Sequence, residues 1–327
     1  MLVLGIECTA HTFGIGLIDS DKKEILYNKK NQFKNESSGM DLRKLSDYHV
    51  SNFEVLLKDV KKFLGSINKG FSDIGLISFS QGPGIGNSLK IGALIAKTLA
   101  IKYDIKIIGV SHIKAHLEIG KMLTGFKDPM FLYVSGVNTQ IIAKDDCGKY
   151  KIYGETEDIG LGNLLDTFAR DSGLGFPGGP LIEEKAKNSK NFIELPYTLK
   201  GMNVSFAGIT SNLKKKIKEG YKISDLCYSL QETCFAIVME VCERAMAYTN
   251  KKEFIIVGGV AANKRLEEMA RNMCNLRGAI YDSFAMEFAM DNGAMIAWQG
   301  YLDRKGARSN IKNLNPMPYI TVESEEI

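Results

Sequence analysis

The sequence lacks CxxC cysteine pairs and contains few histidines. None of the six cysteines forms a CxxC pair, and only four histidines occur in 327 residues. Cys227, Cys234 and Cys242 follow one another at spacings of seven and eight, which places them on one face of a helix. They are expected to be buried free thiols that pack as small apolar side chains. Such cysteines suit a reducing compartment, so a cytoplasmic location is expected.

Long apolar runs are missing as well. No stretch of eighteen apolar residues occurs, so neither a transmembrane helix nor a membrane partner is expected. The N-terminal MLVLGIEC lacks the basic region of a signal peptide and is typical of a buried strand. The formal net charge of +4 permits a nucleic-acid partner without requiring one. With 45% hydrophobic and 24% charged residues, the chain should form two domains or two halves of one.

Strand and helix patterns alternate along the chain, and their order repeats. Residues 2–19 contain an apolar run, a small polar turn and a second apolar run, and 22–30 add a third strand. The same order returns in 130–144 and 148–155. The sequence therefore predicts an α/β fold with an internal duplication. The further elements expected are helices at 41–64 and 88–103, strands at 74–80 and 105–110, and a strand, Gly-Gly turn and helix in 253–273.

The two polar turns are candidates for phosphate binding. Each turn offers backbone N–H groups and hydroxyls, from Thr9 and Thr12 in the first and from Ser135 and Thr139 in the second. Small residues let a backbone approach an anion closely. The alternative is that both turns belong to ordinary hairpins without a ligand. If only one such turn were present, we would favour this alternative. The repetition, together with the Gly-Gly turn before a helix at 258–263, favours phosphate binding.

The stretch SHIKAHLEIG contains two of the four histidines. Ser111 follows a predicted strand and suits a helix N-cap, so His112 and His116 should lie one turn apart on one helix face. A helix N-terminus disfavours imidazolium and leaves neutral rings for a metal. The HExxH protease motif requires Glu after the first histidine, and this chain has Ile113. By itself, the pair favours two partly exposed, locally hydrogen-bonded histidines over a metal site, and spacing names no further ligand.

A glycine-rich turn at 81–87, QGPGIGN, fails the dinucleotide fingerprint. Asn87 stands where the third glycine of GxGxxG belongs, and the GK[ST] arrangement of a P-loop is missing. A tight structural turn is the better interpretation. Two acidic positions have alternatives. Glu183 could contact a ribose, although a surface acid near a helix start is the commoner case, and Asp291 is expected to be an N-cap, with a metal ligand as the alternative that spacing hardly supports. The lysine-rich 212–220 is typical of a solvated helix face and is the best candidate for RNA backbone contact.

Taken in order, nine motifs resemble one family. They are GIECTAHT, SQGPGIG, HIKAH, LYVSGVNTQ, GLGFPGGP, LKGMNVSFAG, SLQETCFA, VGGVAANKRL and MDNGAMIA. This set is similar to the tRNA threonylcarbamoyladenosine transferase family, whose bacterial members are called TsaD or Gcp. Archaeal members, which the AHT after IEC resembles, form the catalytic subunit of the KEOPS complex. Two positions depart from the family pattern: Ser111 replaces Asn, and Val137 replaces a glycine, where a positive φ would strain a β-branched residue.

The resemblance implies an actin-like ATPase fold, with duplicated ribonuclease-H-like lobes around a nucleotide cleft. The expected lobes are 1–128, completed by a C-terminal helix at about 292–327, and 129–291. The implied reaction transfers a threonylcarbamoyl group from threonylcarbamoyl-adenylate to the adenosine 3′ of the tRNA anticodon, in ANN-decoding tRNAs. No catalytic side chain beyond the metal centre is implied, because the substrate arrives activated.

The resemblance also implies a ligand set and cofactors. One divalent or trivalent metal per chain, iron or zinc, would be held by His112, His116, Tyr133 and Asp291. An adenine nucleotide is the second implied cofactor, with magnesium as a further candidate. A phosphate turn would contain Thr9, His11 and Thr12. The nucleotide-binding residues implied are Tyr133, Val134, Ser135, Gly136, Val137, Asp166, Gly179, Glu183 and Asn263.

Partners follow from the family alone. They are tRNA and KEOPS-type subunits: a small dimerising subunit, a kinase that some relatives carry as a fused domain, and an activator of the kinase. Two other functions compete with the transferase. One is a nucleotide-binding actin-like ATPase with a regulatory or scaffold role, since one fold hosts many functions. The other, a metalloprotease, is disfavoured because Ile113 takes the place of the general base.

Overall fold

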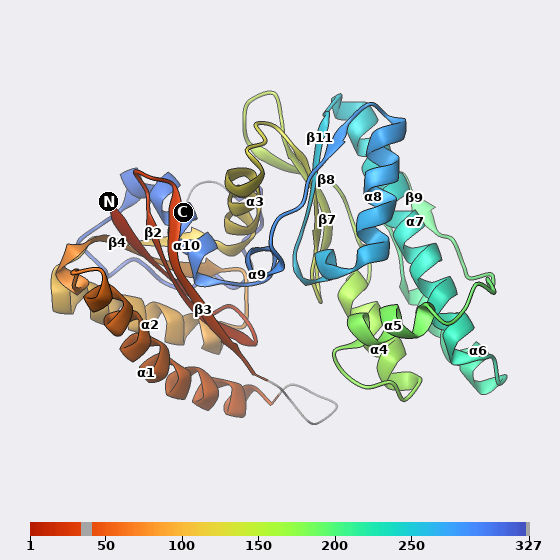
Figure 1. Ribbon diagram of the computed structural model, residues 1–327, viewed down its shortest axis with the longest axis horizontal. Coiled ribbons are helices and arrows are strands. Elements are labelled where there is room, and N and C mark those ends of the chain that lie inside the picture. Colours follow the sequence, from red (N-terminus) through yellow and green to blue (C-terminus); the bar gives the residue numbers. More distant parts are fainter. Residues whose placement is uncertain (34–40, 325–327) are drawn as a thin grey trace. The chain divides into compact units, whose positions relative to one another are not determined.

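The chain forms two compact units (Figure 1). The structure is a computed structural model that describes residues 1–33 and 41–324. The first unit contains Met1–Leu123 and Met290–Ile327, and the second contains Thr124–Ala289. The chain therefore leaves the first unit, builds the second, and returns to the first at Met290.

A five-stranded mixed sheet forms the centre of the first unit. Its strand order is β3-β2-β1-β4-β5. Strand β1 pairs antiparallel with β2 and parallel with β4, so β1 lies in the middle of the sheet. The strands are β1 (Leu2–Glu7), β2 (Thr12–Asp19), β3 (Glu24–Gln32), β4 (Ile74–Gly82) and β5 (Ile107–Ser111).

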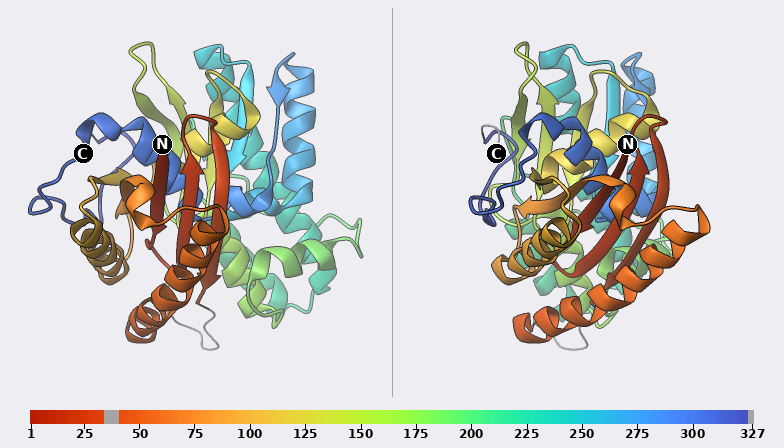
Figure 2. Two further views of the ribbon diagram at one scale, coloured as in Figure 1. Left: turned by 60° about the vertical axis from the view of Figure 1, so that its left-hand side comes forward. Right: turned by 90° about the vertical axis from the view of Figure 1, so that its left-hand side faces the viewer.

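The two faces of this sheet are covered by different helices. Leu4 and Ile6 of β1 pack in one cluster with Leu56 and Ala93, whereas the intervening Gly5 meets α10 on the opposite face. Figure 2 shows the first unit from two further sides. The helices are α1 (Leu42–Ser66), α2 (Gly86–Tyr103), α3 (His112–Thr124) and α10 (Gly293–Leu302), with 3-10 turns η1 (Phe71–Asp73) and η3 (Arg304–Gly306).

The second unit repeats the same sheet. Its order is β12-β11-β6-β7-β8, with β6 antiparallel to β7 and parallel to β11. The strands are β6 (Met130–Val134), β7 (Thr139–Lys144), β8 (Tyr150–Glu155), β11 (Glu253–Val257) and β12 (Ile280–Tyr281), with a separate pair β9 (Leu199–Lys200) and β10 (Asn203–Val204). The helical elements are α4 (Leu161–Asp171), α5 (Gly178–Ala186), α6 (Ala207–Lys218), α7 (Ile223–Thr249), η2 (Gly259–Ala262), α8 (Lys264–Leu276) and α9 (Met286–Ala289).

The two sheets confirm the predicted α/β fold and its duplication. Reading each sheet from its edge, β3, β2, β1, β4 and β5 correspond in order and direction to β8, β7, β6, β11 and β12. Cys227, Cys234 and Cys242 are buried together along α7, as expected from their spacing. Burial raises the pKa of the Cys227 thiol to about 12, so it stays protonated and apolar at neutral pH.

The C-terminal part of the chain differs from the sequence-based expectation. The C-terminal helix, expected over about 292–327, is Gly293–Leu302, and between η3 and residue 324 the chain runs without a regular helix. Arg308 forms an isolated bridge to Ile107 at the edge of the sheet, and Met317 donates its N–H to the Gln81 carbonyl. Among the residues described, no helix combines the length and apolar character needed to cross a membrane.

Glycines set the distance between α10 and the first sheet. A Cβ on Gly293 would lie 2.0 Å from the backbone nitrogen of Gly16, and one on Gly5 would lie 2.1 Å from the Gly293 carbonyl oxygen. Any side chain at these positions would separate helix and sheet. The start of α10 therefore rests directly on the backbone of β1 and β2, and Asn292, the residue before it, lies beside Gly14 of β2.

One carboxylate holds the N-terminus of α6. Asp158 accepts hydrogen bonds from the N–H groups of Phe206 and Ala207 and from the Ser205 hydroxyl, at 2.6–3.1 Å. Its burial acts to raise its pKa, but these bonds outweigh that effect and lower the pKa to about 2. Asp158 therefore caps the N-terminus of α6 from a distant part of the chain, as the side chain of an N-cap residue does for its own helix.

Asp158→Ala should destabilise the chain by about 1–2 kcal/mol, the usual cost of a lost helix cap. Because the folded-state pKa is lowered, the contribution is present above about pH 4 and is lost as pH falls toward 2. Denaturant titrations at pH 7 and pH 3 should show the difference shrinking. The exposed Asp146→Ala is the control and should stay within about 0.5 kcal/mol. An equal loss in both variants, or no pH dependence, would contradict the capping role.

Candidate metal centre

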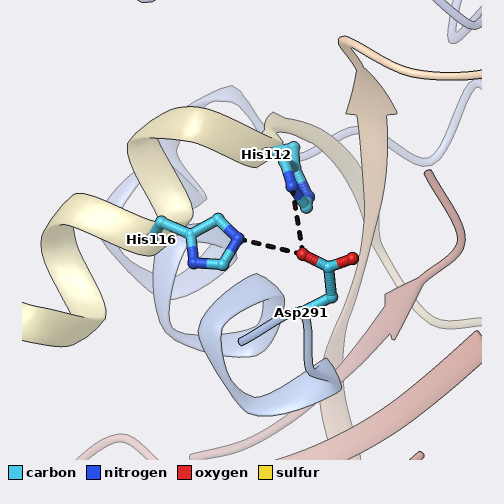
Figure 3. Close-up of side chains that lie close together, drawn as sticks. All are labelled: His112, His116 and Asp291. Carbon is cyan, nitrogen blue, oxygen red and sulfur yellow. Dashed lines mark hydrogen bonds and ion pairs between the residues drawn. The ribbon is translucent and has the colours of Figure 1, made fainter. Parts of the chain in front are cut away.

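The two histidines of α3 project from the first turns of that helix. Strand β5 ends at Ser111 and α3 begins at His112, so no connecting loop separates them. The Ser111 hydroxyl accepts the Lys114 N–H at 3.4 Å, which confirms its expected capping position. His112 and His116 are both buried, and their ring centroids lie 4.7 Å apart at 85° (Figure 3).

Asp291 reaches the histidines from the turn before α10. The N-cap of α10 is Asn292, whose side chain accepts the Met295 N–H at 3.0 Å. The prediction that Asp291 is the N-cap of α10 is therefore wrong, because the side chain of Asn292 has that role. The Asp291 carboxylate points to the imidazoles instead: Oδ1 lies 3.2 Å from His116 Nε2 and 3.5 Å from His112 Nε2.

These three side chains form a group that could hold a metal ion. One ligand atom from each residue lies within 4.8 Å of the others. Three ligands at about 2.0–2.1 Å from a tetrahedral ion would lie roughly 3.3 Å apart. The two histidine–carboxylate separations, 3.2 and 3.5 Å, fit that value. All three residues belong to the first unit, since the chain returns to it at Met290.

Glu7 orients the first histidine from the end of β1. It is fully buried, and its Oε2 lies 3.1 Å from His112 Nδ1. Its Oε1 accepts the Thr9 N–H at 2.8 Å and the Thr9 hydroxyl at 2.5 Å. With Glu7 accepting the Nδ1 proton, Nε2 faces Asp291 as the ligating atom. This carboxylate–histidine arrangement is typical of metal sites.

The titration of the group follows from its buried charges. Burial acts to lower the pKa of His112, but the carboxylates of Glu7 and Asp291 outweigh it and raise the pKa to about 9. Burial lowers the pKa of His116, and the neighbouring His112 adds to that effect. The pKa of Asp291 lies well below its usual range, because hydrogen bonding and charge from both histidines outweigh its burial. Metal binding at neutral pH would therefore release a proton from His112.

The remaining two histidines lie near the same group. His49 of α1 is fully buried, and its Nε2–H donates to the Ala10 carbonyl at 2.7 Å. The charge of His11 acts on both Asp291 and His49. His11 thus lies in the turn between β1 and β2, His49 bonds to that turn at Ala10, and His112 Nδ1 lies 3.4 Å from the Thr9 hydroxyl. Neither Glu7 nor His49 was predicted from the sequence. A signal for Glu7 existed, since it is the one acid in the buried strand LVLGIE.

The predicted phosphate turn lies beside the metal group. Thr9 connects the two through its bonds to Glu7, and its carbonyl accepts the Ile85 N–H at 2.7 Å. Within the described residues, the backbone N–H groups of Ala10 and His11 have no hydrogen-bond acceptor. Two neighbouring N–H groups without an acceptor are the donors that an anion requires.

The equivalent turn of the second unit has the same property. Ser135 closes it by accepting the Asn138 N–H at 3.1 Å, and its carbonyl accepts the Gly162 N–H of α4 at 3.1 Å. In the part of the chain described, the N–H groups of Gly136 and Val137 have no acceptor. Val137 is 70% exposed and does not have a positive φ, so its β-branched side chain is unstrained there. Tyr133 and Val134 precede this turn and are buried in β6.

Three other predicted nucleotide-binding residues hold the starts of helices in the second unit. Asp166 accepts the Gly178 N–H at 2.8 Å, which fixes α5 and places Gly179 in its first turn. Glu183 accepts the Lys264 N–H at 3.0 Å, so it is not a free surface acid. Asn263 is the N-cap of α8 and donates to Gln231 at 2.7 Å. The structure thus brings Glu183 and Asn263 together.

Two mixed sheets of the same topology define a protein of the actin-like ATPase fold, and its first unit contains the histidine–carboxylate group. Full-length HypF in its phosphate- and nucleotide-bound form matches with a TM-score of 0.63 at 12% identity, over 93% of this chain and 55% of that one. Component A of the Acidaminococcus fermentans (R)-2-hydroxyglutaryl-CoA dehydratase gives a TM-score of 0.57 at 12% identity, over 93% and 99%. These likenesses concern the fold.

Sequence similarity identifies the family. A family model described as tRNA N6-adenosine threonylcarbamoyltransferase matches residues 24–298, and the chain belongs to that family. A relative of that name from Thermococcus sibiricus is 48% identical over 95% of each chain. Another from Nanoarchaeum equitans is 48% identical over 92% of this chain and 93% of its own. A probable bifunctional tRNA threonylcarbamoyladenosine biosynthesis protein from Methanocaldococcus jannaschii is 46% identical, and the match covers 94% of this chain and 56% of that protein.

Proposed function

We propose that this chain transfers a threonylcarbamoyl group from threonylcarbamoyl-adenylate to the N6 amino group of the adenosine 3′ of the anticodon in ANN-decoding tRNAs. Membership of the family supports the reaction. The observation that carries the proposal is the group of the buried His112 and His116 with the half-buried Asp291, oriented by Glu7. In the transfer, the amine nitrogen bonds to the carbamoyl carbon, the bond from that carbon to the phosphate oxygen breaks, and AMP and a proton leave.

His112, His116 and Asp291 would hold one iron or zinc ion, with Tyr133 as the further ligand that the family resemblance implies. Two imidazoles and a carboxylate suit either metal. When bound, the ion would supply a Lewis acid for phosphate or carbamoyl oxygens. Glu7 keeps the Nδ1 proton on His112, and Thr9 keeps the Glu7 carboxylate in place. The chain's own contribution is therefore to fix the ligands before substrate arrives.

The adenylate would be held by backbone donors and helix starts. The N–H groups of Gly136 and Val137 suit its phosphate, as do those of the turn containing Thr9, His11 and Thr12. Glu183 suits a ribose hydroxyl, because one of its oxygens is anchored on Lys264. Asp166 and Asn263 would act mainly by fixing α5 and α8. Tyr133, Val134, Ser135 and Gly179 complete the proposed set, and magnesium would accompany an ATP-like ligand.

Partners are proposed from the family. A kinase is one of them, as the family resemblance implies. Curated relatives with bifunctional names extend well beyond the part that this chain matches, which supports a fused partner domain in the family. The small dimerising subunit and the kinase activator complete the proposed KEOPS-type complex, and the cytoplasm is its proposed location.

The proposal is tested with the full chain, KEOPS-type partners, threonylcarbamoyl-adenylate and unmodified tRNA. Nucleoside analysis by mass spectrometry should detect threonylcarbamoyladenosine, with one AMP released for each modified adenosine. Metal analysis of the same preparation should give about one ion per chain. ATP binding and hydrolysis without any modified nucleoside would instead indicate a regulatory ATPase and would reject the transferase.

A further inference from the structure

The lysine-rich segment between residues 212 and 220 has no part in the metal centre or the nucleotide turns. In the structure it forms the C-terminal half of α6 and the turn that follows. Ile209 and Leu213 bury the opposite side of the helix in the core of the second unit. This packing directs Lys214, Lys215 and Lys218 to solvent, and all three are exposed. The presentation of the lysines is therefore fixed by the core.

A second helix extends this basic surface. Asp171 at the end of α4 lies 3.4 Å from Lys214 Nζ and 3.8 Å from Arg170 Nε, so two cations share one carboxylate. Helices α4 and α6 lie against each other in the second unit. We refer to Arg170, Lys214, Lys215 and Lys218 as the lysine face.

The charge of this surface exceeds what local structure requires. Including Lys216, which lies over the Tyr221 ring, five cations stand against two carboxylates, Asp171 and Glu219. The carboxyl ends of α4 and α6 each carry roughly half a negative charge, which accounts for about one cation. About two positive charges remain. In the described part of the chain, Lys218 has no ion-pair partner, and the exposed pair of Lys215 with Glu219 is weak.

The lysine face begins next to a proposed substrate-binding residue. Asp166 and Arg170 are four residues apart on α4, so they lie on the same side of that helix, roughly 6 Å apart along its axis. A polyanion on the lysine face would therefore approach the helix start that Asp166 fixes in α5.

We propose that the lysine face binds the phosphate backbone of tRNA. The identity of the polyanion as tRNA rests on the proposed function. Its binding at the lysine face rests on the excess positive charge, the exposure of the lysines, and the packing that fixes α6. Lysine side chains contact phosphates without reading bases, so the surface would position tRNA and contribute affinity without sequence preference. These residues are positioning residues, since none of them belongs to the metal centre.

The test compares two triple variants of the full chain. The first is Lys214→Gln, Lys215→Gln and Lys218→Gln, which removes three charges and keeps the apolar stems. The matched control is Lys58→Gln, Lys61→Gln and Lys62→Gln, which removes three exposed charges from α1 of the first unit. Binding of unmodified tRNA is measured by fluorescence anisotropy at several salt concentrations.

The first variant should weaken tRNA binding about tenfold to hundredfold near physiological salt. It should also reduce the slope of log K against log salt by roughly 0.7–0.9 for each phosphate that a lysine no longer neutralises. The control should keep both the affinity and the slope. At saturating tRNA, turnover of the first variant should equal that of the unmodified chain, with KM raised. Unchanged affinity, or an equal loss in both variants, would overturn the proposal. Failure of the proposed function differs from failure of this inference, because in that case the chain without any substitution would form no threonylcarbamoyladenosine.

Discussion

Asp291→Asn is expected to remove the bound metal and lower the rate of tRNA modification by about a hundredfold or more. The asparagine side chain keeps the shape of the carboxylate but lacks its charge, and Oδ1 is the atom that both histidines face. A Lewis acid at a reacting oxygen supplies several kcal/mol, and a hundredfold loss corresponds to about 2.7 kcal/mol. Metal content by elemental analysis and modified nucleoside by mass spectrometry measure the two effects.

Asp303→Asn provides the control for this experiment. Asp303 follows the other end of α10, where it accepts a hydrogen bond from Gln299 and has no part in the metal group. Its variant should retain both metal and activity. If Asp291→Asn kept a full complement of metal, the assignment of this carboxylate as a ligand would be wrong. If it lost metal but kept activity, the ion would be structural rather than catalytic.

Glu7→Gln is expected to weaken metal binding by about tenfold to a hundredfold, the usual effect of losing a carboxylate behind a ligating histidine. Glutamine can still accept the His112 Nδ1 proton, and it nearly matches the volume of the buried glutamate. The lost charge makes the imidazole a poorer ligand. A chelator competition, monitored by the metal remaining on the chain, measures the affinity.

The same variant should change how the metal-free chain responds to pH. Since the pKa of His112 is raised to about 9, its protonation stabilises the folded state below about pH 6.5, and this contribution is lost as pH rises through 9. Glu7→Gln should lower that pKa, so its stability should vary less over this interval in denaturant titrations. The surface variant Glu54→Gln on α1 is the control and should match the unmodified chain. Unaltered metal affinity in Glu7→Gln would contradict the orienting role.

The fold could be predicted from the sequence because its signals are local. Apolar runs, polar turns and helical periodicity follow one another in the same order twice. Because the backbone hydrogen-bonding groups of these strands must be paired within a sheet, few arrangements of the strands are possible. Half of the metal group was equally local, because His112 and His116 are four residues apart on one helix. The family resemblance added Asp291, which spacing alone left open between an N-cap and a ligand.

Other parts of the site depend on contacts between distant segments. In the sequence, Glu7 differs from its neighbours only as the one acid of a buried strand, and its partner His112 is found only where β1 ends beside α3. The sequence offered a ribose contact or a surface acid for Glu183, and its bond to the Lys264 N–H is seen only in the folded chain. The expectation that Val137 would be strained depended on a φ that only the folded turn could give.

By itself, the sequence determined the α/β duplication, the burial of the α7 cysteines, the histidine pair and the lysine-rich helix, because each depends on the spacing of neighbouring residues. The tertiary structure decided which carboxylates face the histidines. That choice depends on Gly293 and Gly16, whose missing side chains let α10 rest on β1 and β2 and carry Asp291 to the histidines. Gly16 and Gly293 are far apart in the sequence, and their close approach is fixed by packing between helix and sheet. No local sequence pattern therefore indicates it.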